Sequence, residues 1–509
     1  MRKLLLAATV LAACGGAGEA SVPPHLDIAV PPLQSTADTA RALREPPPSS
    51  LASKPSPFPT IERAKLDSGI RVAVVEAHAI PVVQIRVVTF AGMGYGAPGV
   101  ADMTAEMLKD GGTRTMAATD LLTHVESLGA SLSVDVDFDR SVLSLGVTVP
   151  HLDEALGLLG QIVQSPRFDG GELRKLKARR TDEAREAARG NGTWCATHLL
   201  FRELFAESNP YAHYDVVPSE IAKITDQAIR DFHKRFYVPE NIEVIVTGDV
   251  TAARAQAAVK KAFGGFAAAA PLQKVTFPEA IAPAKRRVIL ASRPHSEQSD
   301  IFVVGLAPAR STASWPDLRV ANQVLGGGVA SRLFADVREQ RSLAYSTRSQ
   351  ILELAHGSEP VLAYAGTATK KTGLAIQGVL ENMEKISTAG QPIDQAELSS
   401  AGRYLSDIFA IRLESIGSIA DLVAVQDTLA LPDGYWDTYR AAVRDVSVDH
   451  AQAAAKRLFG GTAQLIVVAG DAAVIGKALS HFGEVVVVDP EKEFVTTSTI
   501  AADPTAALE

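Results

Sequence analysis

The sequence predicts an α+β protein made of two homologous domains, each a mainly antiparallel sheet packed with helices. The first observation is an internal repeat: Gly248-Asp249 follows a helical and then a strand-like run, and recurs 222 residues later as Gly470-Asp471. The second is that Arg71-Val72 and Arg287-Val288 open similar strand-like runs at an offset of 216 residues. Offsets this similar at both ends indicate a duplicated unit of about 210 residues.

The third observation is that strand and helix patterns alternate within each unit. Residues Ser131 to Val149 alternate as two paired strands would, whereas Leu156 to Val163 and Thr225 to Phe236 have helical spacing. Thr225 and Ser447 precede equivalent helical runs in the two units and suit the N-cap position.

Composition divides the chain further. An Ala-, Gly- and Pro-containing stretch from Gly264 to Lys285 is typical of a connector. The predicted segments are a signal peptide (1–13), a Pro-rich tether (14–60), an N-terminal domain (61–265), a linker (266–285), a C-terminal domain (286–490) and a frayed tail (491–509).

Charge and cysteine content exclude several classes of function. The 509 residues carry a formal net charge of −8, which argues against a nucleic-acid partner because such proteins concentrate positive charge. Only two cysteines are present, too few for a disulfide framework or a cysteine-based metal site. Cys195 lies among apolar residues at helical spacing and is expected to be a buried thiol, with His198 of the same helix in a packing or capping role.

The N-terminus predicts export and lipidation. Met1 to Lys3 is basic, Leu4 to Ala13 is apolar, and Leu11-Ala-Ala-Cys14 resembles a bacterial lipobox, which implies cleavage before Cys14 and lipid on its sulfur. The alternative is an ordinary signal peptide cut near Ala20. Lipidation places the protein in the cell envelope, and Gly15 resembles the pattern that sorts lipoproteins to the outer membrane, facing the periplasm.

Pro98 and Gly111 bound a predicted helix over residues 98–110. Its flanking residues resemble the metal-binding helix of the pitrilysin/insulinase peptidases, a family that includes the mitochondrial-processing-peptidase type. The residues that carry the resemblance are Gly99, Ala101, Met107, Leu108, Gly112 and Thr113, and weaker similarity extends over about 60–490. The resemblance implies that both domains are pitrilysin-like.

The metal-binding residues of that family are changed in this sequence. Asp102 and Glu106 stand at the positions of the two zinc-binding histidines, Ala105 stands at the position of the catalytic Glu, and Glu183 matches the third ligand. A methyl group at position 105 cannot accept a proton, so general-base catalysis is lost. The eleven histidines include no pair three to five residues apart, which independently excludes a two-His zinc helix.

Two roles remain open for the three carboxylates. Asp102, Glu106 and Glu183 could offer oxygen ligands to Ca²⁺ or Mg²⁺, but without carbonyl ligands they make a poor cage. Alternatively the two carboxylates on the helix, Asp102 and Glu106, are solvated in a cavity or bind a nearby Lys or Arg. The basic run from Arg174 to Arg180 alternates with acidic residues and is expected to form a solvated helix face.

The second half keeps a motif that the resemblance assigns to substrate binding. Gly326-Gly-Gly328 ends a predicted helix, and Arg338 and Tyr345 follow with the family spacing of seven residues. In the family such a pair reaches toward substrate at the partner's zinc. On spacing alone, Arg338 could instead pair with Glu339 or Asp336 and Tyr345 could be a core residue.

Loss of the metal residues together with retention of the Arg/Tyr pair implies a non-catalytic subunit of a heterodimeric zinc metallopeptidase. The expected partners are a zinc-bearing homologous subunit, unfolded peptide as substrate, and a membrane through the lipid anchor. No cofactor is expected in this chain, and zinc is expected in the partner. The alternatives are a structural or peptide-binding envelope lipoprotein without a peptidase role, and an autonomous metalloendopeptidase with remodelled ligands.

Overall fold

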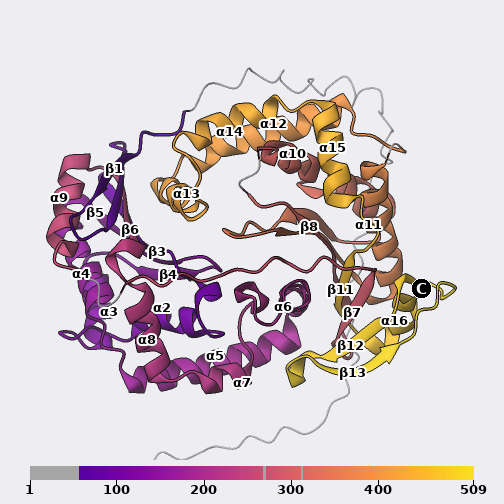
Figure 1. The fold of residues 1–509 in the computed structure, drawn as a ribbon, viewed down its shortest axis with the longest axis horizontal. Coiled ribbons are helices and arrows are strands. Elements are labelled where there is room, and N and C mark those ends of the chain that lie inside the picture. Colours follow the sequence, from indigo (N-terminus) through magenta and orange to yellow (C-terminus); the bar gives the residue numbers. More distant parts are fainter. Residues whose placement is uncertain (1–56, 268–270, 311–312, 389) are drawn as a thin grey trace, which may run out of the picture. The chain divides into compact units, whose positions relative to one another are not determined.

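The computed structural model describes residues 57–267, 271–310, 313–388 and 390–509. Two β-sheets are present, and helices pack on both, so the predicted α+β class with two sheets is confirmed (Figure 1). The signal peptide, Cys14 and most of the Pro-rich tether lie outside the described residues. Among the described helices, none combines the length and the apolar composition needed to cross a lipid bilayer.

The first half of the chain forms a six-stranded sheet in the order β1-β2-β6-β3-β5-β4. Its strands are β1 (Glu62–Lys65), β2 (Arg71–Glu76), β3 (Val82–Thr89), β4 (Leu132–Val136), β5 (Ser141–Thr148) and β6 (Ile242–Gly248). Only β2 and β6 pair in parallel. Strand β6 is buried at every position, which accounts for its nearly continuous apolar sequence.

The second half forms a seven-stranded sheet in the order β13-β12-β7-β11-β8-β10-β9. Its strands are β7 (Arg287–Ser292), β8 (Gln298–Ala307), β9 (Ser346–Ile351), β10 (Glu359–Ala368), β11 (Leu465–Gly470), β12 (Val485–Asp489) and β13 (Val495–Ile500). The run β7-β11-β8-β10-β9 repeats β2-β6-β3-β5-β4 of the first sheet, including the parallel pairing of its first two strands. The duplication seen in the sequence is therefore present in the strand order.

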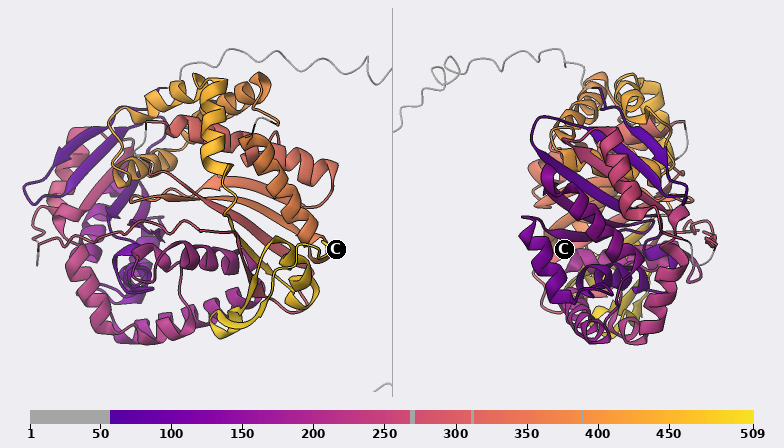
Figure 2. Two further views of the ribbon diagram at one scale, coloured as in Figure 1. Left: turned by 45° about the vertical axis from the view of Figure 1, so that its right-hand side comes forward. Right: turned by 90° about the vertical axis from the view of Figure 1, so that its left-hand side faces the viewer.

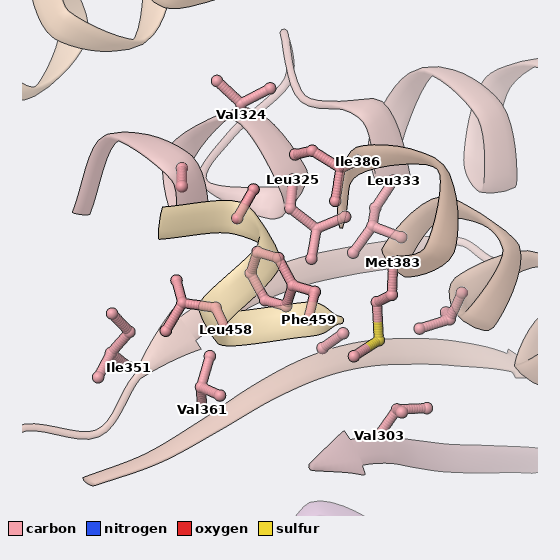
Figure 3. Packing of buried hydrophobic residues seen from close by; sticks show 14 of the residues in the cluster. Val303, Val324, Leu325, Leu333, Ile351, Val361, Met383, Ile386, Leu458 and Phe459 are labelled. Atoms are coloured by element: carbon pink, nitrogen blue, oxygen red, sulfur yellow. The ribbon is translucent and has the colours of Figure 1, made fainter. Parts of the chain in front are cut away.

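Each sheet packs one face against helices of its own half. In the first half these are α2 (Val100–Asp110), α3 (Ala118–Ser127), α4 (Leu152–Gln164), α8 (Asp226–Phe236) and α9 (Ala252–Phe263). In the second half they are α10 (Trp315–Gly326), α11 (Thr372–Ser387), α12 (Gln395–Arg412), α14 (Tyr435–Arg444), α15 (Val448–Phe459) and α16 (Ala472–Leu479). Figure 3 shows the second core, where Phe459 and Leu458 of α15 approach Val361 of β10 and Met383 of α11 lies over Val303 of β8.

The other faces of the two sheets are covered by an exchange of equivalent helices. Helix α6 (Gly192–Leu204) of the first half packs Leu200 and Phe201 against Phe302 and other residues of the second sheet. The ribbon views show α6 beside this sheet (Figures 1 and 2). Helix α13 (Ile416–Thr428) of the second half packs Ile419 and Val423 against Val88 and other residues of the first sheet. The two halves therefore form one compact unit.

Polar contacts reinforce this exchange. Arg86 on β3 donates from Nε to Oδ1 of Asp421 on α13 at 2.9 Å, and Arg63 on β1 donates from Nη1 to Oδ2 of Asp427 at 2.9 Å. A buried carboxylate, Asp139, accepts the backbone N–H of Ala355 across the same boundary at 2.9 Å. Because these contacts involve residues more than 200 positions apart, local sequence patterns do not reveal them.

The C-terminal residues differ from the predicted frayed tail. Strand β13 pairs with β12, and Phe494, which is 1% exposed, stacks on His198 of α6 with ring centroids 4.4 Å apart. The side chains of β13 are exposed, so the strand has no apolar alternation by which it could be recognised. The buried thiol of Cys195 and the packing role of His198, whose Nδ1 lies 2.9 Å from the carbonyl oxygen of Tyr214, agree with the sequence analysis.

Candidate functional site

Helix α2 carries the residues at the family's metal positions. It begins two residues later than predicted because Gly99 adopts a left-handed φ of 74°, and a Cβ at this position would lie 2.5 Å from Cγ1 of Val216. Met103 and Met107 point into the core, whereas Asp102 and Glu106, one turn apart, are partly exposed. The helix thus presents two carboxylates on one face.

Helix α5 (Gly170–Gly190) supplies an arginine that contacts Glu106. Arg179 Nη2 lies 3.1 Å from Oε2 of Glu106 and 3.5 Å from Oδ2 of Asp110, at the end of α2. The same guanidinium has Nε 3.8 Å from Oε1 of Glu183 on its own helix. Arg179 therefore bridges the residue at the second histidine position and the residue at the third ligand position.

The next residue, Arg180, anchors a second set of contacts. Its Nη2 donates to Oδ1 of Asp215 at 2.9 Å and its Nη1 lies 3.3 Å from Oε2 of Glu183. Asp215 also accepts the indole N–H of Trp194 at 2.7 Å. Arg179, Arg180, Asp215 and Trp194 were not assigned to this site from the sequence. Arg179 is 49% exposed, as expected for a solvated helix face, whereas Arg180 is 24% exposed.

Asp102 is held in an environment that disfavours its charge. Burial is the main cause that raises its pKa to about 6, and the neighbouring carboxylates of Asp215 and Glu106 act in the same direction. Arg180 opposes this shift. Asp102 is therefore partly neutral just below physiological pH, unlike an ordinary surface aspartate.

The donor set does not fit a zinc ion. Zinc in proteins prefers imidazole and thiolate ligands in a tetrahedral arrangement, whereas Glu106 and Glu183 contact a permanently charged guanidinium. Glu183 is also 51% exposed. Across the described ranges, no group of three His, Cys, Asp or Glu side chains is placed to hold a metal ion.

The proton-transfer group is missing at the same place. Ala105 is fully buried, so no side chain at that position can activate a water molecule. Glu106 and Glu183 instead take part in ion pairs with arginines, which is one of the two roles considered from the sequence. In this structure the ion pairs of Arg179 with Glu106 and Asp110 join α5 to α2.

Arg338 lies in the second half, in the π-helical turn Phe334–Gln340. Its guanidinium lies 4.4 Å from the ring centroid of Phe334, and its Nε lies 3.5 Å from Oε1 of Glu339. The Arg338 side chain remains 41% exposed. Asp336, the other partner considered from the sequence, instead binds Arg341 at 2.9 Å.

Tyr345 is a surface residue, not a core residue. It is 51% exposed, and its hydroxyl donates to Oε1 of Gln298 at 3.2 Å. Its ring lies over Gly366, where a Cβ would come within 2.8 Å of Tyr345 Cζ, so glycine is required for this ring position. Gln298 and Gly366 lie more than 20 residues from Tyr345, and no local sequence pattern indicated that they contact it.

A surface pocket of about 580 Å³ adjoins Tyr345 through Gln298. Its walls come from both halves, with Gly190 to Thr193 at the junction of α5 and α6 on one side and Arg293, Gln298 and Asp300 on the other. Asp300 accepts hydrogen bonds from Thr193 at 3.0 Å and from Tyr364 at 2.8 Å. In the described chain, no hydrogen bond or ion pair connects Arg338 or Tyr345 to Asp102, Glu106 or Glu183.

Known proteins share this architecture. A family model described as the peptidase M16 inactive domain matches residues 223–405. A Helicobacter pylori protein named non-peptidase homolog YmxG is 26% identical over 357 residues, which cover 69% of this chain and 79% of that protein.

Solved structures show the same fold. A peptidase M16 inactive domain from Pseudomonas fluorescens has a TM-score of 0.74 at 23% identity, covering 81% of this chain and 98% of that one. The periplasmic protease PqqL from Escherichia coli has a TM-score of 0.68 at 15% identity, covering 81% of this chain and 48% of that one. Residues 223–405 thus match the inactive domain of the M16 peptidases, the pitrilysin/insulinase family, and the chain is similar to a non-peptidase homologue and to a solved inactive domain of that family.

Proposed function

We propose that this protein is the non-catalytic subunit of a heterodimeric zinc metallopeptidase, supplying Arg338 and Tyr345 to a zinc-bearing homologous partner that hydrolyses unfolded peptides. The observation that carries the proposal is the contrast between the two sites. Arg179 contacts Glu106 and Glu183, at two of the positions where the family binds its metal, while Arg338 and Tyr345 remain about half exposed. In this proposal the zinc and the general base belong to the partner.

The chemistry of the two side chains suits substrate binding. A guanidinium offers several N–H donors to a peptide carbonyl, and a phenol can donate a hydrogen bond to the oxygen that becomes negative in the tetrahedral intermediate. The contacts that both side chains make in this structure are long for hydrogen bonds. The hydroxyl of Tyr345 lies 3.2 Å from Gln298, and Nε of Arg338 lies 3.5 Å from Glu339. A substrate could therefore replace them at little cost.

The length comparison supports a paired assembly. The part of the chain that superposes on PqqL spans about half of that protease. A longer chain can therefore contain about twice the body described in this structure. In the proposal, the second body is a separate polypeptide.

The decisive experiment is reconstitution with a zinc-bearing homologue recovered by pull-down from native membranes. We expect peptide hydrolysis by the mixture, and a loss of kcat of about 10²-fold for Tyr345→Phe, since a single transition-state donor has that magnitude. Arg338→Ala should mainly raise KM. Arg341→Ala is the matched control, because Arg341 lies on the same segment but pairs with Asp336 and Glu381.

Unchanged hydrolysis by both site variants would refute the assigned role. It would favour a structural or peptide-binding envelope lipoprotein, for which the local contacts of Arg338 with Phe334 and Glu339 are the supporting observation. The remodelled autonomous metallopeptidase is disfavoured by the guanidinium of Arg179 beside Glu106.

The proposal also places the protein in the cell envelope, anchored through lipid on Cys14. Labelling of cells with radioactive palmitate should mark the wild-type protein and not the Cys14→Ser variant. Membrane association that survives this substitution would contradict the lipid anchor.

A further inference from the structure

A second pocket lies within the helical layer of the second half, away from the residues discussed above. Its volume is about 190 Å³, and its lining residues come mainly from α10, α12, α13 and α14. Most of the lining is apolar, with Leu405, Ile408, Phe409, Leu422, Val425 and Trp436. No residue of either site described above contributes to it.

Two arginines give this apolar pocket a cationic side. Arg310 Nε lies 3.2 Å from Oε2 of Glu353, and Arg319 Nη1 lies 3.5 Å from Oε1 of the same carboxylate. A third arginine, Arg412, also lines the pocket. The pocket lining thus holds three guanidinium groups and one carboxylate, which pairs with two of them.

Arg310 is the most deeply placed of these groups. Its side chain is only 6% exposed, and among the described residues its Nη1 has no hydrogen-bond partner. The guanidinium lies between the rings of Trp315 and Tyr435, at 4.4 and 5.2 Å from their centroids, which fixes its position without neutralising its charge. A buried donor left unpaired costs free energy, so its retention calls for an explanation.

The neighbouring acid does not supply the missing negative charge. Glu359 is buried, and burial together with the nearby Glu353 raises its pKa to about 9, so that it is neutral at physiological pH. The pocket therefore combines a surplus of positive charge with an apolar wall.

We propose that this pocket binds a small organic carboxylate, with the ligand's carboxylate on Arg310 and Arg319 and its apolar body against Phe409, Leu422 and Trp436. The size limits the ligand, because a cavity of about 150 Å³ accommodates benzene. A pocket of about 190 Å³ therefore takes one phenyl ring or a short alkyl chain. This inference is independent of the proposed peptidase role.

Two sources provide this chemistry: a free aryl or alkyl carboxylic acid, and the C-terminal carboxylate of a peptide with an apolar last residue. Isothermal titration of the full-length protein with 3-phenylpropionate, with its amide, and with a short peptide ending in Phe distinguishes them. We expect saturable binding of at least one carboxylate and none of the amide. Binding of the free acid alone or of the peptide alone identifies the source.

Variants locate the binding to this pocket. Arg310→Gln should weaken carboxylate binding about tenfold or more, the usual effect of losing a charged hydrogen bond. Ile408→Trp fills the partly exposed side of the pocket while leaving the arginines in place, and should abolish binding even if Arg310→Gln fails to fold. Arg444→Gln is the control, because Arg444 pairs with Asp407 between the same helices but does not line the pocket.

Three results would overturn the proposal. They are no binding of any carboxylate at millimolar concentration, equal binding of acid and amide, and binding that Ile408→Trp leaves unchanged.

Discussion

Arg179 Nη2 lies 3.1 Å from Oε2 of Glu106, so a guanidinium contacts the residue that stands where the family places its second zinc-binding histidine. A zinc ion would bring positive charge to the space between α2 and α5. Here the guanidinium of Arg179 supplies positive charge instead, and it stays protonated at all physiological pH values. Helix α5 thus remains joined to α2 through ion pairs.

Removal of Arg180 should destabilise the first half. Arg180→Ala leaves Asp215 without its ion-pair partner and increases the cost of the charge on Asp102. We expect a loss of about 1–3 kcal/mol in the free energy of unfolding, measured by urea denaturation. The control is Arg185→Ala, whose partner Asp182 is largely exposed and whose loss should cost less than about 0.5 kcal/mol. Equal losses in the two variants would contradict the account.

Asp102→Asn should stabilise the protein at neutral pH. The pKa of Asp102 is about 6 in the folded protein and 3.8 ordinarily, so the folded state binds more protons between these values and loses stability as pH rises. Asparagine does not ionise, so the variant does not lose this stability as pH rises. We expect the variant to gain up to about 3 kcal/mol above pH 6 and nothing below about pH 4. Unfolding curves at pH 4, 5, 6 and 7 test this, and a gain that does not depend on pH would contradict it.

The exchanged helix α13 should contribute to the stability of the first half. Val423 is fully buried in the cluster with Val88 and Ile245, and truncation to alanine removes apolar contact across the boundary. Val423→Ala should cost about 1–3 kcal/mol in thermal or urea unfolding. Val474→Ala, at an exposed valine of α16, should change stability by less than about 0.5 kcal/mol. A neutral Val423→Ala would show that the exchange contributes little.

The C-terminal residues should be part of the folded structure. Phe494→Ala removes a buried ring stacked on His198 and should cost about 3–5 kcal/mol. The next residue provides the control, since Val495 is 59% exposed and Val495→Ala should be nearly neutral. Similar midpoints for wild type and Phe494→Ala would restore the frayed tail predicted from the sequence.

The duplicated architecture could be predicted because it rests on local patterns that occur twice. Strand runs such as 242–247 and helix caps such as Thr225 are set by neighbouring residues, and the structure keeps them: Thr225 accepts the N–H of Ala228. A helix from Ser331 through Arg338 could also be predicted, but not its π-helical form over Phe334–Gln340. The exposed strand β13 escaped prediction because it has no apolar alternation.

The sequence allowed us to predict which residues stand at the candidate site, but not how they interact. The sequence identified Asp102, Ala105, Glu106 and Glu183, but not the side chains that contact them. Arg179 and Arg180 lie in a highly charged helix whose pattern is the same whether it faces solvent or another helix. Their role depends on the packing of α5 against α2, which tertiary structure alone determines.

Metal analysis of the purified full-length protein tests the central claim most directly. After incubation with excess zinc and removal of the unbound metal, the account predicts far less than one zinc ion per chain and no peptide hydrolysis sensitive to a chelator. One zinc ion bound per chain, with chelator-sensitive hydrolysis by the isolated protein, would contradict it.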